Sequence, residues 1–111
     1  MNSPDALAAL SALAHEHRLA VFRLLVQAGS EGMAAGEIAE AMGMAPSSLS
    51  FHLAHLNRAG LIAQQRESRS LIYSADFARM NALLGFLTEN CCAGRACAPV
   101  AKPAQAKRRK A

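Results

Sequence analysis

All three cysteines of this 111-residue chain lie in one short stretch near its C-terminal end, ENCCAGRAC. Cys91 and Cys92 are adjacent, and Cys97 follows five positions after Cys92. Thiolates are soft ligands that select soft ions, and three of them match the pyramidal coordination of trivalent arsenic or antimony. Neighbouring side chains on an intact helix point about 100° apart. Three sulfurs can therefore share one ion only if the helix ends near Asn90 and Gly94 lets the chain turn back.

Other interpretations of these cysteines stay open. A thiol–disulfide pair such as Cys92 with Cys97 would make a redox sensor, and the cysteines could also have no role. A zinc or cadmium site needs a fourth ligand, and no histidine lies nearby in the sequence, although His15 or His17 could fold in. The N-terminus lacks a basic segment followed by an apolar stretch, so we expect a cytoplasmic protein whose thiols stay reduced.

The charge distribution gives a weak indication of a nucleic-acid partner. The sequence pI is near 9.4, but five of the 12 basic residues lie in the last ten positions. Among the remaining segments, only residues 44–75 have a basic excess, which is a modest signal for DNA binding. No apolar run approaches the roughly 20 residues that a membrane span needs.

Apolar spacing, glycines and prolines predict the elements that must position these groups. We expect a mainly α protein, with helices over residues 4–14, 17–29, 34–43, 45–60 and 76–90, and strands over 61–66 and 70–74. Residues 1–98 would form one folded domain. Residues 99–111, which are rich in Ala, Pro, Lys and Arg, would be a disordered basic tail.

The two helices before the hairpin predict a winged helix-turn-helix. A tight turn at GMAP separates a short helix from one whose Leu49, Leu53 and Leu56 share a core face. The hairpin that follows would be the wing. We expect double-stranded DNA to be contacted by small polar and aromatic side chains of the second helix and by the wing tip, namely Ser47, Ser48, Ser50, Phe51, His52, Arg66 and Arg69. His52 could instead cap a neighbouring loop, and His55 would be solvated.

These residues carry a resemblance to a known family. The stretches LSALAHEHRLAVFRLL and EIAEAMGMAPSSLSFHLAHLNRAGLI, with the hairpin ending IYS, resemble the ArsR/SmtB family of metal-sensing repressors over roughly residues 7–88. The resemblance implies a homodimer joined through its first and last helices, and an operator that is released on metal binding. The segment CCAGRAC is similar to the C-terminal arsenic-binding cysteines of some members.

The chain also departs from the family pattern. The Cys-x-Cys site on the third helix is absent, because Ala34 and Gly36 stand there, and residues 76–98 hold no histidine for a zinc site on the last helix. Pro46 and Phe51 occupy positions where polar residues are common in the family, and Ser68 stands where glycine is usual. The resemblance therefore implies DNA binding without defining the operator sequence.

Together, the patterns predict a homodimeric, non-enzymatic transcriptional repressor that As(III) or Sb(III) releases from operator DNA through Cys91, Cys92 and Cys97. The alternative is a redox- or zinc/cadmium-responsive regulator of the same fold. An apolar interaction module and a small metal buffer are further rivals. No catalytic constellation or organic cofactor motif is visible in the sequence.

Overall fold

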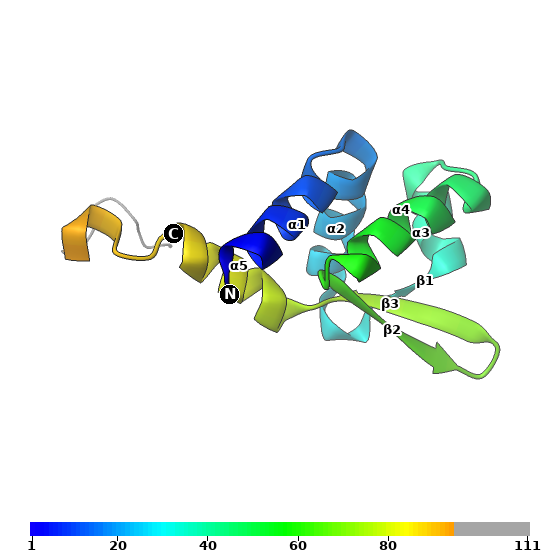
Figure 1. Cartoon of the computed structure of the whole chain (residues 1–111). Helices are drawn as coiled ribbons and strands as arrows, with labels where there is room; N and C mark the ends of the chain where they lie inside the picture. Colours follow the sequence, from blue (N-terminus) through cyan, green and yellow to red (C-terminus); the bar gives the residue numbers. More distant parts are fainter. Residues whose placement is uncertain (95–111) are drawn as a thin grey trace, which may run out of the picture.

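Five α-helices and a small antiparallel sheet form the protein in the computed structural model, which describes residues 1–94 (Figure 1). Cys97 and the predicted basic tail lie outside the described residues. The order is α1 (Ser3–Leu13), α2 (Glu16–Ala28), η1 (Gly29–Glu31), β1 (Met33–Ala34), α3 (Ala35–Met42), α4 (Pro46–Arg58), β2 (Ile62–Glu67), β3 (Ser70–Ala75), α5 (Phe77–Leu87) and η2 (Cys91–Gly94). The predicted winged helix-turn-helix fold, with its helices and hairpin, is confirmed.

Side-chain caps explain where several helices begin. Asn2 accepts a hydrogen bond from the Asp5 amide at 2.9 Å and caps α1. Asp76 accepts one from the Arg79 amide at 2.9 Å and caps α5. Pro46 lies in the first turn of α4, where its missing N–H costs nothing.

The core lies between α2, α3, α4 and the base of the hairpin. Its largest fully buried side chains are Val21, Leu25, Ile38, Leu49, Leu56 and Leu61. The predicted core face of α4 is confirmed, since Leu53 is buried beside Leu49 and Leu56. Helix α1 is different: it packs inward through Ala6, Ala9 and Ala12, while Leu7 is 66% exposed. Small side chains bring α1 close to the core and leave Leu7 and Leu10 outside, while Leu13 is partly buried against the core.

The sheet has the order β1-β3-β2, and both pairings are antiparallel. In the hairpin Glu67 pairs with Ser70, so Ser68 and Arg69 form the tip. The two-residue strand β1 was not predicted. It pairs Met33 with Tyr73. The strand depends on Gly32, which has a φ of +72°; a Cβ atom at this position would overlap the backbone carbonyl of Tyr73.

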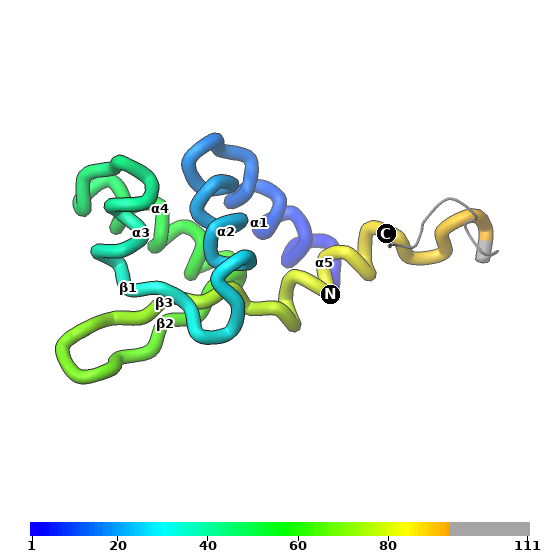
Figure 2. The backbone as a smooth tube through the Cα atoms, turned by 180° about the vertical axis from the view of Figure 1, so that it is seen from behind, coloured from blue at the N-terminus to red at the C-terminus, as the bar shows by residue number. Residues whose placement is uncertain are grey.

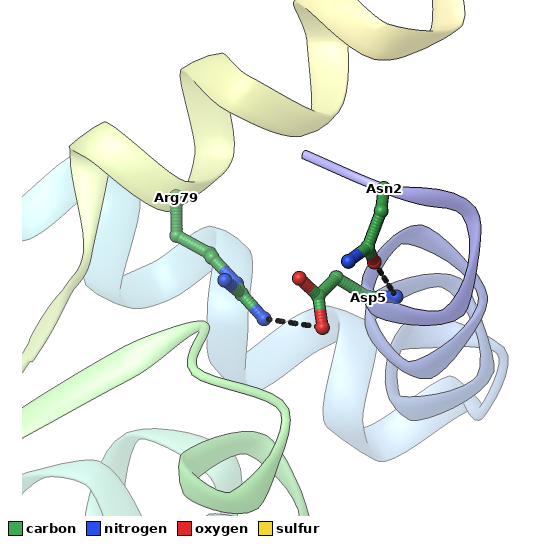
Figure 3. Close-up of polar contacts among 3 residues, drawn as sticks. All are labelled: Asn2, Asp5 and Arg79. Atoms are coloured by element: carbon green, nitrogen blue, oxygen red, sulfur yellow. Dashed lines mark hydrogen bonds and ion pairs between the residues drawn. The ribbon is translucent and has the colours of Figure 1, made fainter.

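The hairpin and the C-terminal part of the described chain project in opposite directions from the helical body (Figure 1). Seen from behind, the hairpin extends on the side where α3 and α4 lie, and α5 runs out beneath α1 on the other side (Figure 2). Arg79 of α5 forms an ion pair with Asp5 of α1 at 3.8 Å (Figure 3). Both partners are partly exposed, so this pair orients the two helices and adds little to stability.

Candidate DNA interface and cysteine site

The outer face of α4 presents small polar side chains and one aromatic ring. Ser47, Ser48 and Ser50 are exposed, and Phe51 is 60% exposed. The residue before the helix is Ala45, which has no side-chain hydrogen bond to the first turn. The backbone N–H groups of that turn are therefore open to an acceptor such as a phosphate oxygen. This face combines groups that can contact both a DNA backbone and base edges.

The wing supplies the positive charge that the face of α4 lacks. Arg66 lies on β2 opposite Leu71, and Arg69 lies in the hairpin tip. Both guanidinium-bearing residues are exposed. The neighbouring Glu67 is exposed as well, so the net charge of the tip is small. Contact with a phosphate backbone would rest on these two arginines rather than on a broad basic surface.

His52 does not lie on the face with the other predicted DNA contacts. Its side chain is buried, with 8% exposed, and its ring centroid lies 4.8 Å from that of His15. Burial lowers the pKa of His52 below its ordinary value, and the charges of His15 and Arg18 lower it further. The sequence predicted a DNA contact through this ring, and the burial of the ring contradicts that prediction. The alternative of a loop cap is also unsupported, because its Nδ1 has no hydrogen-bond partner among the described residues.

His55 is only partly solvated. It is half-buried, and its ring meets the edge of Phe51 with 4.6 Å between centroids. Desolvation lowers the pKa of His55, and the positive charges of Arg18 and Arg58 add to the effect. His55 therefore supports the position of the Phe51 ring on the outer face of α4.

A cluster that was missing from the sequence-based predictions lies behind this face. His15 caps α2 by accepting a hydrogen bond from the His17 amide to its Nδ1 at 3.1 Å, as expected for residues that start a helix. The folded chain then brings His52 of α4 against both rings. One signal was available: His52 follows Leu49 by three positions and precedes Leu56 by four, so helical spacing places it on the core stripe.

The cysteine segment begins where α5 has already ended. The helix stops at Leu87 with Thr88 as its C-cap, which confirms that the cysteines do not sit on an intact helix. Cys91 and Cys92 are exposed, and their Sγ atoms lie 3.5 Å apart. The backbone is left-handed at Asn90 and Cys92, and this turn is what lets adjacent side chains converge. Two bonds of about 2.3 Å to one ion place their sulfurs about 3.3 Å apart at a pyramidal angle near 90° and about 3.8 Å apart at the tetrahedral angle. The observed separation lies within this range.

Exposed leucines form an apolar surface on α1 and α5. Leu84 and Leu87 are 53% and 55% exposed, and Leu7 and Leu10 lie on the outer side of α1. An apolar groove lined by residues of α2 and α5, among them Leu19, Phe22 and Met80, borders this surface. Exposed apolar patches of this kind mark interaction sites.

Comparisons with known proteins agree with the helix-turn-helix fold. A family model described as a helix-turn-helix domain matches residues 13–65. The HTH-type transcriptional regulator YgaV of Escherichia coli is 34% identical over 82% of this chain and 90% of its own length. The transcriptional activator HlyU of Vibrio cholerae is 30% identical over 78% of this chain and 77% of HlyU.

Solved structures extend the match. HlyU superposes with a TM-score of 0.66 over 82% of this chain and 96% of that chain, and its reduced form matches as well. The homodimeric winged helix-turn-helix DNA-binding domain Mb0332 of Mycobacterium bovis, described as a possible ArsR-family regulator, matches with a TM-score of 0.62 at 28% identity, over 83% of this chain and 85% of that chain.

These findings define a winged helix-turn-helix transcriptional regulator, a class of DNA-binding proteins that are not enzymes. Two further matched structures, which are 22% and 23% identical to this chain and carry the ArsR name, share the fold. The chain belongs to the HTH-type transcriptional regulators represented by YgaV. Within residues 1–94, none of the helices has the length and apolar character needed to cross a membrane.

Proposed function

We propose that this protein is a homodimeric repressor that binds operator DNA and is released when As(III) or Sb(III) binds Cys91, Cys92 and Cys97. The observation that carries the proposal is the 3.5 Å separation of the Cys91 and Cys92 sulfurs just beyond the end of α5. Two converging thiolates already provide most of a soft three-coordinate site. The third cysteine, five positions further along, lies outside the described residues.

DNA binding is assigned to the outer face of α4 and to the wing. Ser47, Ser48, Ser50 and Phe51 would contact the operator from α4. Arg66 and Arg69 would contact its phosphates. A dimer would place two such α4 helices on successive half-sites of a pseudo-palindromic operator.

Dimerisation is assigned to α1 and α5. Leu84 and Leu87 are exposed on α5, and α5 is linked to α1 through the Arg79–Asp5 ion pair. Mb0332 is described as homodimeric with the same fold, which supports a dimer here. A second copy of the chain is the occupant that would cover these leucines.

The link between the two sites runs through α5. The cysteines follow directly on this helix, so drawing three sulfurs onto one ion would reshape the end of the dimerisation helix. The two α4 helices would then lose the spacing that matches the operator. Release requires that the ion bind the DNA-free form more tightly than the DNA-bound form. The free energy of this coupling sets the fold-change in DNA affinity.

The test is fluorescence anisotropy with a labelled duplex that the protein itself selects from a random pool. Arsenite titrated into the wild-type complex should release the DNA. Cys91→Ser, Cys92→Ser and Cys97→Ser should each bind DNA like the wild type without arsenite and resist release. A wild-type complex that is unaffected by both arsenite and antimonite would contradict the proposal.

A second function has one specific observation in its favour. A solved relative is described as reduced HlyU, which names a redox state in a protein of the same fold. The exposed Cys91 and Cys92 of this chain could respond to oxidation in place of metalloid. Peroxide in the same anisotropy assay separates the two: release by peroxide with no effect of arsenite would favour redox sensing. HlyU is also named an activator, so the assay should be followed by transcription from the selected operator to establish the sign of regulation.

A further inference from the structure

Three histidines from two helices meet at the start of α2. One ring nitrogen from each of His15, His17 and His52 can be chosen so that the three atoms lie within 4.8 Å of one another. We propose that His15, His17 and His52 form a binding site for a divalent transition-metal ion of the Zn²⁺, Ni²⁺ or Cu²⁺ class, separate from the cysteine segment. Neutral imidazole is a preferred ligand for these ions.

The ring geometry suits one shared ion. The centroid separations are 4.8 Å for His15–His52 and 5.6 Å for both His15–His17 and His17–His52. A tetrahedral ion with metal–nitrogen bonds of about 2.0 Å would hold its nitrogens about 3.3 Å apart. His15 and His17 are exposed and free of tight packing, so rotation of their rings can close the remaining distance toward the fixed ring of His52.

His52 is the member that a purely structural role does not explain. It is the one buried polar or charged residue of the described chain, and its Nδ1 is inaccessible and has no hydrogen-bond partner there. Buried polar atoms in native proteins nearly always have a partner. A metal ion held also by the two neighbouring imidazoles would give one ring nitrogen of this buried histidine a polar partner.

The ligand set defines the type of site. Three protein nitrogens leave at least one coordination position for water or another small ligand. The arrangement differs from the cysteine site in donor chemistry, because nitrogen ligands select borderline ions and thiolates select soft ones. The ion would also link the first turn of α2 to His52 of α4, which directly follows Phe51.

The experiment uses the full chain without a polyhistidine tag and with all three cysteines replaced by serine. Zn²⁺ is titrated in competition with a chromophoric chelator, and Co²⁺ is followed by absorption. We expect one Zn²⁺ per chain, and Co²⁺ bands of nitrogen and oxygen ligation without thiolate charge transfer. His15→Asn and His17→Ala should each weaken Zn²⁺ binding at least tenfold, which is the order expected on losing a group that supports a metal site.

The substitutions are chosen to leave the fold intact. Both residues are exposed, and Asn at position 15 keeps a side-chain oxygen that can cap α2, so only the ligand is lost. His55→Ala is the control, since it removes a histidine that lies on α4, like His52, but outside the cluster. Its Zn²⁺ affinity should equal that of the cysteine-free parent. Absence of Zn²⁺ binding in the parent, or equal binding by the His15 and His17 variants, would overturn the proposal.

Discussion

At the scale of single residues, the wing arginines carry the clearest electrostatic role. Arg66 and Arg69 are exposed at the hairpin tip, and the serine-rich face of α4 brings no positive charge. Replacing either arginine by alanine should weaken binding to every DNA duplex, whatever its base sequence. The dependence of log affinity on log salt concentration should become shallower by about 1 for each phosphate contact that is lost.

Anisotropy titrations at several salt concentrations would measure this change. Arg23→Gln serves as the control, because it removes the same charge from α2, where Arg23 borders the groove beside Met80 and Leu84. An unchanged salt slope in the Arg66 and Arg69 variants would show that the wing does not contact the DNA backbone.

At the scale of elements, the attachment of β1 to β3 depends on Gly32. Its φ of +72° and the closeness of the Tyr73 carbonyl leave no room for a side chain. Gly32→Ala should lower the free energy of unfolding by about 1–3 kcal/mol, measured by urea denaturation followed by circular dichroism. Gly36→Ala in α3 adds a methyl group in open space, and its stability should be unchanged or higher by up to about 1 kcal/mol. Equal stability of the two variants would contradict this account.

The elements also show how far sequence reasoning reaches. The helices and the hairpin follow from leucine spacing, from Pro46 and from Asp76, because these signals are local. Strand β1 has two residues, too few for a periodic signal, and it exists only because β3 offers an edge. The histidine cluster forms only when α2 packs on α4, and no local sequence pattern predicts that packing. The sequence predicted the last helix to run to residue 90, and α5 ends three residues earlier, at Leu87.

At the scale of the whole molecule, the exposed leucines of α5 should determine the oligomeric state. Leu84→Glu combined with Leu87→Glu places two charges on a surface that a second copy would bury, and desolvating them is costly. Sedimentation velocity should show a dimer for the wild type and a folded monomer for this variant. The monomer should bind the selected operator at least tenfold more weakly, because two linked half-sites no longer act together.

Phe51→Glu is the matched control for that experiment. Phe51 is as exposed as Leu84 and Leu87 but lies on α4, so this variant should remain dimeric and lose DNA affinity. If the double leucine variant stays dimeric, the dimer interface does not depend on Leu84 and Leu87 of α5.

The hydrogen bond from the His17 amide to Nδ1 of His15 has a consequence for any ion that His15 holds. A neutral imidazole has a single unprotonated nitrogen. While Nδ1 of His15 accepts this hydrogen bond, the ring proton resides on Nε2. A metal ion bound at Nδ1 would occupy the accepting lone pair directly. A metal ion bound at Nε2 would displace the proton to Nδ1, which could then no longer accept. The cap and the ion exclude each other. Hydrogen exchange of one backbone amide, that of His17, would then report metal occupancy from within the first turn of α2.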